Sequence, residues 1–230
     1  MAAGYKQFCP VAMAAEILST RWTIVLLREL VEGSTKFSDL RKGVPRMSPA
    51  LLSQRLKDLE SSGVIERVKS PAKRGAYEYV LTEAGRDLRN VVEAIGVWGQ
   101  RWVDAELTLE NLDPSLLMWD IRRNLNTKPL PERQCVIEFR YPDLPKAQQS
   151  WWLIAETTGS IDLCSVEPGF EVDLYVTTKL RSMTSIWMGF TTVSEELENG
   201  TLTLDGSRPI ASNMQKWLGL SPFAMEKKRV

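Results

Sequence analysis

Residues 49–62 carry side chains whose types and spacing suit hydrogen bonding to a ligand. If the segment is helical, Leu52, Leu56 and Leu59 share one side at the spacing i, i+4 and i+7 and face a core. The opposite side then presents small, hydroxyl and amide side chains and one cation, namely Ala50, Ser53, Gln54 and Lys57. Hydroxyl and amide groups donate and accept hydrogen bonds, so this side can recognise a polar surface.

Such a face fits the major groove of DNA, which is about 12 Å wide and admits a helix with small leading side chains. Ser53 and Gln54 would contact base edges, and Lys57 and the flanking Arg55 would reach phosphate. Ser48-Pro49 supplies a helix N-cap and the residue that best tolerates the first helical position. The alternative is an ordinary amphipathic helix with a solvated polar face.

Basic residues are concentrated around this segment. Between Arg41 and Arg74 there are nine Lys or Arg and three Asp or Glu, whereas the whole chain has 29 of each kind. Residues 1–107 hold 16 basic and 13 acidic residues, and residues 108–230 hold 13 and 16. The zero net charge is therefore a sum over two unlike parts. Clustered cations attract a phosphate backbone, and Lys73 and Arg74 lie at the tip of an expected hairpin, where they would enter the minor groove.

Catalysis and metal binding find little support. The chain has no histidine, which excludes a Ser-His-Asp or Cys-His catalytic arrangement and a zinc site with His ligands. The acidic residues are scattered and no nucleophile–base pair is visible. We expect no enzyme activity, no catalytic or metal-binding residues and no cofactor.

The compartment is expected to be the cytoplasm. Three cysteines without tight spacing (Cys9, Cys135 and Cys164) favour a reducing environment over a disulfide framework. No apolar run reaches the roughly 18 residues that a membrane helix needs, so no membrane partner is expected.

The elements that must position these residues follow in a recognisable order. The length of 230 residues, with 43% apolar and 25% charged residues, suits one large or two modest globular domains. Periodicity predicts helices over residues 11–17, 21–30, 36–41 and 49–62, strands over 64–69 and 76–81, and a long helix over 82–106. This is the order of a winged helix-turn-helix.

The second half has a different pattern. One or two helical turns near residue 116 precede strand-like runs over 135–141, 151–156, 161–166 and 171–177. A helix over 180–188, a turn helix over 193–197, a strand over 201–204 and a helix over 210–218 follow. The expected fold class is α+β, with a winged helix-turn-helix domain over 1–107, a linker over 108–114 and a sheet-and-helix domain over 115–230.

The first half resembles the HxlR-type winged-helix transcription regulators, relatives of the MarR type. The resemblance rests on Cys9-Pro10, Arg21-Trp22-Thr23, Phe37-Ser38-Asp39-Leu40, Leu52-Ser53-Gln54-Arg55-Leu56, Gly63-Val64-Ile65 and Thr82-Glu83-Ala84-Gly85, in unbroken order over about residues 5–105. It implies a homodimer on a pseudo-palindromic operator in double-stranded DNA, with residues 49–62 as recognition helix and 69–77 as wing. The DNA-binding residues would be Ser48, Pro49, Ala50, Ser53, Gln54, Arg55, Lys57, Lys69, Lys73 and Arg74.

The long helix carries an apolar stripe that suggests dimerisation. It comprises Leu88, Val91, Val92, Ile95, Trp98 and Trp102. This is more apolar surface than a small winged helix covers alone, and a two-fold contact would bury it and space the recognition helices about one DNA turn apart. The alternative is that the second domain of the same chain covers the stripe.

Cys9 is a candidate redox sensor. In some relatives a cysteine at this Cys-Pro position senses oxidants or electrophiles, and a helix start favours a thiolate. The alternative is a small packing residue without reactivity. Cys135 and Cys164 lie in apolar strand runs and are expected to be buried.

Residues 115–220 resemble sterol-carrier-protein-like domains through a strand, helix, small helix, Asn199-Gly200-Thr201-Leu202 strand and final helix. In that family the sheet and helices can enclose an apolar cavity, which would here hold a small apolar ligand. The expected lining is Trp119, Phe139, Trp151, Met183, Trp187, Phe190 and Trp217. Such an aromatic set can equally be core.

The sequence thus predicts a dimeric, sequence-specific DNA-binding transcription regulator whose second domain binds a small apolar molecule or stabilises the dimer. The alternative is a small-molecule or lipid carrier whose helix-turn-helix serves protein contacts.

Overall fold

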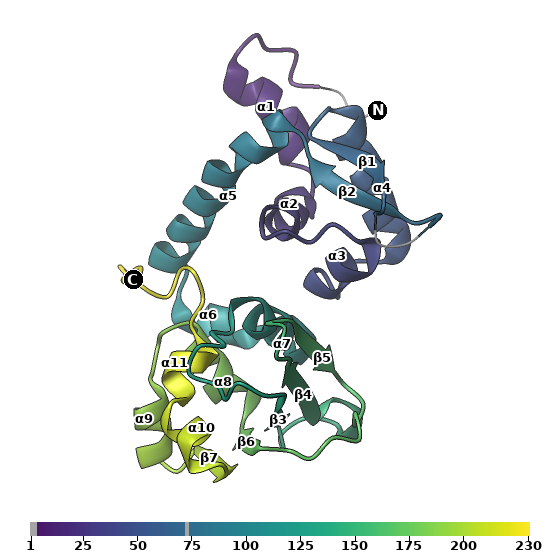
Figure 1. Ribbon diagram of the computed structural model, residues 1–230. Helices are drawn as coiled ribbons and strands as arrows, with labels where there is room; N and C mark the ends of the chain where they lie inside the picture. The colour runs from purple at the N-terminus through teal and green to yellow at the C-terminus, as the bar shows by residue number, and fades with distance from the viewer. Residues whose placement is uncertain (1–3, 72–73) are drawn as a thin grey trace. The chain divides into compact units, whose positions relative to one another are not determined.

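The computed structural model describes residues 4–71 and 74–230 (Figure 1). The chain divides into two compact units, Met1–Gly96 and Val97–Val230. Each unit has its own hydrophobic core among its described residues. The division falls within α5 (Glu83–Trp102), so the first part of this helix belongs to the first unit and its last turns to the second.

The first unit has the element order of a winged helix-turn-helix, which confirms the expected fold. Ahead of α5 lie α1 (Pro10–Leu18), α2 (Thr23–Val31), α3 (Phe37–Gly43), α4 (Pro49–Ser61), β1 (Ile65–Lys69) and β2 (Tyr77–Leu81). Its core is formed mainly by leucines, of which Leu26, Leu27, Leu40, Leu52 and Leu56 are fully buried. Leu52, Leu56 and Leu59 all face inward, as their spacing predicts.

The hairpin is joined to the helices by backbone contacts. β1 and β2 pair antiparallel, with Ile65 opposite Leu81 and Lys69 opposite Tyr77. The Tyr79 N–H donates to the Thr35 carbonyl at 2.8 Å, which links β2 to the start of α3. Gly85 is required where α5 begins, since a Cβ there would lie 2.1 Å from the Val64 carbonyl oxygen. The hairpin is thus held between α3 and α5.

The second unit contains a five-stranded sheet in the order β5-β4-β3-β6-β7 within the described residues. The strands are β3 (Cys135–Arg140), β4 (Ser150–Ala155), β5 (Ile161–Cys164), β6 (Leu174–Thr178) and β7 (Leu202–Gly206). Only the β3–β6 pair among them is parallel. The helical segments are α6 (Ala105–Glu110), α7 (Pro114–Asn124), η1 (Lys146–Gln148), α8 (Leu180–Trp187), α9 (Val193–Glu198), α10 (Arg208–Ser212) and α11 (Met214–Leu218).

Helices and strands of this unit share one main core. Side chains from α7, α8, α10 and α11 pack with inward residues of the sheet such as Ile137, Phe139 and Val176. A smaller cluster of Val136, Trp152 and Ile154 lies on alternate positions of β3 and β4. Because successive residues of a strand point to opposite faces, both faces of this sheet bury apolar side chains.

The C-terminal tail is attached to the end of α5 inside the second unit. Arg101 pairs with Glu226 at 2.6 Å, and the Arg229 N–H donates to the Arg101 carbonyl at 2.8 Å. The Arg229 guanidinium lies 5.8 Å from the centre of the Trp102 ring. These contacts hold the last turn of α5 against its own unit.

Several expected boundaries were wrong, and distant or capping contacts account for three of them. The long helix predicted to reach residue 106 ends at Trp102, because Asp104 caps a new helix by accepting the Glu106 N–H at 2.6 Å. The helix predicted over 210–218 is divided at Asn213, whose side chain donates to the Pro209 carbonyl. β6 begins at Leu174 rather than residue 171, because the Asp173 carboxylate takes the Val136 N–H.

Residues 108–114, which we expected to be a linker, include the end of α6 and the first residue of α7. Asp113 caps α7 by accepting the N–H groups of Ser115 and Leu116. In the described part of the chain no single helix is long and apolar enough to cross a membrane; α1 and α2 pass together by length and composition but are bent by 85°.

Candidate nucleic-acid interface

Helix α4 presents its polar face because its apolar face is fully used by the core. The Ser48 hydroxyl caps the helix by accepting the Leu51 N–H at 3.2 Å, and Pro49 occupies the first turn. Pro49, Ala50, Gln54 and Lys57 are exposed. Ser53 is half-buried. The start of the helix therefore carries small, accessible side chains, which suits entry into a major groove about 12 Å wide.

The side chains of Gln54 and Arg55 both donate hydrogen bonds to the carboxylate of Asp58, which lies on the next turn of α4. The Gln54 side-chain amide donates to the Asp58 carboxylate at 2.8 Å, and Arg55 donates to the other carboxylate oxygen at 2.8 Å. Arg55 also donates from Nε to the Arg21 carbonyl at 3.2 Å. Gln54 remains exposed on the polar face, whereas Arg55 is half-buried against the start of α2.

The exposed cations complete the candidate interface. Lys57, Lys69 and Arg74 are exposed, and their charged groups form no ion pair or hydrogen bond with the residues that the structure describes. Arg67 lies along the hairpin with its guanidinium 3.9 Å from the centre of the Tyr77 ring. Lys73, which we predicted at the hairpin tip, lies outside the described residues. Lys57, Lys69 and Arg74 can therefore neutralise phosphates without breaking an ion pair within the described residues.

The orientation of the hairpin is supported by Glu78 on β2, a residue that was not among the predicted site residues. Its carboxylate accepts from the Ser70 hydroxyl at 2.5 Å and from the Thr35 hydroxyl at 3.1 Å. Ser70 follows β1 and Thr35 precedes α3, so one side chain joins both arms of the hairpin to the helices. A carboxylate between two hydroxyl-bearing segments was the signal that could have revealed it.

The predicted apolar stripe on α5 divides between two environments. Val92 is buried and Leu88 packs against the core of the first unit. Val91 and Ile95 line an apolar groove of about 540 Å³ together with Pro10, Val11, Ala14 and Leu18. In the second unit Trp98 and Trp102 are 61% and 45% exposed. The α1 side chains of the groove were missed, although their i, i+3 and i+7 spacing was visible in the sequence.

The thiols differ in their environment. Cys9 is exposed at the N-cap of α1, and the backbone N–H groups of Ala12 and Val11 lower the pKa of its thiol from the ordinary value. Burial raises the pKa of Cys135 to about 12. Cys164 was expected to be buried but is half-buried, packed against the cluster of Val136, Trp152 and Ile154. The sensor role of Cys9 stays a prediction.

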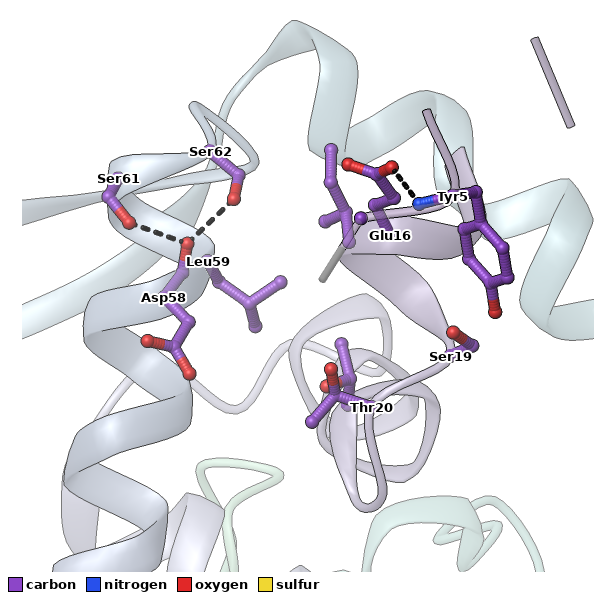
Figure 2. Close-up of a pocket in the computed structure, with 11 residues that line it drawn as sticks. Tyr5, Glu16, Ser19, Thr20, Asp58, Leu59, Ser61 and Ser62 are labelled. Carbon is purple, nitrogen blue, oxygen red and sulfur yellow. Dashed lines mark hydrogen bonds between the residues drawn. The ribbon is translucent and has the colours of Figure 1, made fainter. Parts of the chain in front are cut away.

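A cavity of about 720 Å³, lined by both polar and apolar side chains, lies beside the C-terminal end of α4, and nothing in the sequence pattern indicated it. Figure 2 shows the Ser61 and Ser62 hydroxyls donating to the Asp58 carbonyl, and the Tyr5 N–H donating to the Glu16 carboxylate. Segments that are far apart in the sequence form its walls, so neither periodicity nor spacing predicts it.

The residues predicted to line a ligand pocket are largely core. Phe139, Trp151, Met183, Trp187 and Trp217 belong to the main cluster of the second unit, and the Phe139 and Trp217 rings meet edge to face at 6.4 Å. Trp119 is buried, with the Arg122 guanidinium 4.9 Å from its ring centre, and Phe190 is half-buried. The apolar ligand stays a prediction.

The helix order, the antiparallel hairpin and the exposed polar face of α4 define a winged helix-turn-helix protein. A family model described as HxlR-like helix-turn-helix matches residues 17–107. The chain belongs to this HxlR-like family, as its similarity to relatives from Bacillus subtilis also shows.

The HTH-type transcriptional regulator YvaP of Bacillus subtilis is 36% identical over 100 residues, covering 43% of this chain and 93% of the relative. YdeP from the same organism is 34% identical over 96 residues, covering 42% of this chain and 75% of the relative. Among solved structures, the redox regulator HypR in its reduced form is 27% identical, with a TM-score of 0.37 over 40% of this chain and 91% of that chain.

The contacts of Glu78 predict that the stability of the hairpin depends on pH. The Ser70 hydroxyl first, and then the Thr35 hydroxyl and the charge of Lys36, lower the pKa of Glu78 and outweigh the opposing effect of burial. A lowered pKa in the folded state stabilises the protein above the ordinary pKa of Glu, and this stabilisation is lost as pH falls through the lowered value.

Glu78→Gln should therefore reduce the free energy of unfolding at neutral pH, and its difference from the unmodified protein should shrink in acid. Chemical denaturation at several pH values measures this difference. Glu66→Gln on β1 is the matched control, because Glu66 is exposed on the same hairpin. An equal decrease in the free energy of unfolding of both variants at every pH would contradict the role of Glu78.

Proposed function

We propose that this chain is a DNA-binding transcription regulator in which α4 enters the major groove and the β1–β2 hairpin contacts the flanking backbone. The observation that carries the proposal is the accessible face of Ala50, Gln54 and Lys57 on a helix whose other face is fixed in the core. The exposed Lys69 and Arg74 extend the cationic surface along the hairpin. The relatives are themselves named HTH-type transcriptional regulators, which supports this function.

Specific contacts divide between the two elements. Gln54 and Ser53 can hydrogen-bond base edges, which distinguish all four base pairs in the major groove. Lys57, Lys69, Arg74 and Lys73 of the wing would bind phosphate, which positions the protein without reading sequence. We therefore assign specificity to α4 and most of the sequence-independent affinity to the hairpin.

Substitution at Ala50 tests whether α4 enters DNA. Ala50→Glu places a carboxylate at the leading end of α4, where it would face the negatively charged groove. Like-charge contacts at an interface cost several kcal/mol, so binding to a random-sequence DNA pool should weaken at least roughly tenfold in an anisotropy assay. The helix itself should tolerate the change, because an acidic residue in the first turn is favourable.

Ala84→Glu is the matched control, since Ala84 is an exposed residue of the first turn of α5 and the change in net charge is identical. Its affinity should stay close to that of the unmodified chain. If both variants lose affinity equally, only net charge matters, and α4 does not enter the groove. If neither binds less tightly, the helix-turn-helix serves another partner, such as a protein.

We further propose that the regulator is a homodimer that contacts two half-sites through its two α4 helices. The apolar groove between α1 and α5 supports this, since Val11 and Ile95 are 76% and 46% exposed on its walls. Contiguous exposed apolar surface of this kind is typical of interaction sites. A two-fold axis through such a contact would match a pseudo-palindromic operator.

Ile95→Glu should convert the dimer to a monomer, because a carboxylate would be buried without a partner in the two-fold contact. Sedimentation equilibrium measures the mass. Asn90→Glu adds the same charge to an exposed position of α5 that does not line the groove, and should remain dimeric. A monomeric unmodified chain, or an Ile95→Glu variant that is still dimeric, would contradict this assembly.

A further inference from the structure

An acidic side chain lies on the helix face that we assign to DNA. Asp58 follows Gln54 by one helical turn, so the two side chains are neighbours on the surface of α4. A carboxylate beside phosphate is unfavourable, and basic residues outnumber acidic ones by nine to three between Arg41 and Arg74. A direct contact with DNA therefore does not explain why Asp58 lies on this face of α4.

The hydrogen bonds of Asp58 to neighbouring side chains of α4 do explain its position. One carboxylate oxygen accepts from the Gln54 amide nitrogen at 2.8 Å, and the other accepts from Arg55 at 2.8 Å. Arg55 is in addition held by the Arg21 carbonyl at 3.2 Å. Asp58 therefore binds both Gln54, at the centre of the face of α4 that we assign to DNA, and the neighbouring Arg55.

A carboxylate fixes the direction of the Gln54 amide. Ionised Asp accepts hydrogen bonds and cannot donate one, so only the NH₂ end of the amide can face it. The carbonyl oxygen of Gln54 must then point elsewhere, and a half-turn of the amide would place two oxygens against each other. Gln54 consequently offers DNA its oxygen and its remaining N–H, which are one acceptor and one donor.

This combination distinguishes adenine from guanine. Adenine presents a donor at N6 and an acceptor at N7 in the major groove, which match an amide bidentately. Guanine presents two acceptors, at O6 and N7, and would be recognised better by an amide free to turn its NH₂ group outward. The neighbouring carboxylate would also repel the guanine acceptors.

We propose that Asp58 is a specificity-determining residue, which orients the Gln54 amide so that α4 prefers adenine over guanine and keeps Arg55 from becoming an additional phosphate contact. This inference rests on the proposed function. Asp58 acts through Gln54 and Arg55 and is therefore a positioning residue with no base contact of its own.

The test is selection from a pool of random-sequence duplex DNA by the full-length chain and its variants, followed by affinity measurements on the selected site. With Asp58→Ala, the preference for adenine over guanine at the position read by Gln54 should fall roughly tenfold, the scale of one bidentate contact. Affinity should also fall more steeply with salt, by about 0.9 in the log–log slope for each Arg55 that gains a phosphate.

Asp58→Asn should give an intermediate preference, because its amide oxygen can still accept from Gln54 but carries no charge and can turn. Glu60→Ala is the matched control, since it removes an exposed acid from the same helix. It should leave base preference unchanged. Gln54→Ala should abolish the preference that Asp58 controls, and thermal unfolding monitored by circular dichroism establishes that each variant is folded.

An Asp58→Ala protein that is folded, binds DNA and keeps the original base preference would overturn this inference while leaving the proposed function intact. The inference would also be overturned, with the proposed function intact, if Gln54→Ala altered the base preference at no position of the selected DNA site. An unmodified chain that selects no DNA from the pool would overturn the proposed function itself, so the two failures are distinguishable.

Discussion

Burial of Leu52, Leu56 and Leu59 is the constraint on which the DNA-facing surface depends. Each of these side chains is at most 1% exposed in the core of the first unit. A fully buried leucine contributes roughly 1.5–3 kcal/mol, so a rotation of α4 that exposed all three would cost an amount comparable to the stability of a small domain. The helix can therefore present only one face, and that face carries Ala50, Gln54 and Lys57.

The β1–β2 hairpin is held in place by fewer contacts than α4, and these contacts are more polar. Backbone pairing of Tyr79 with Thr35 and the two hydroxyl contacts of Glu78 join it to the start of α3. These contacts join the hairpin to α3, and β1 shares the leucine core with α4 through Ile65, so the cations of the hairpin keep a defined position relative to the DNA-facing side of α4. The Asp58 contacts act at a finer scale, since they orient side chains on a helix that the leucines have already positioned.

Sequence periodicity was sufficient to predict the helix order, the inward face of α4 and the hairpin, because each is encoded by residues close together in the chain. It was insufficient where a distant contact decides the outcome. Arg55 donates to a carbonyl 34 residues away, a contact that no local pattern indicates. Asp104 starts a new helix where an apolar pattern continues, and the predicted pocket residues Phe139 and Trp217 pack against each other. Such outcomes depend on rotamers and capping, which composition does not specify.

The dependence of DNA affinity on salt concentration tests the central claim most directly, because an exposed cationic surface must release counterions from phosphate. Lys57, Lys69, Lys73 and Arg74 from two subunits would supply about eight phosphate contacts, which predicts a linear log–log plot with a slope near −7. Affinity should then fall roughly 10⁴-fold between about 50 and 200 mM salt. An affinity that does not change over this range would contradict the assignment of this surface to DNA.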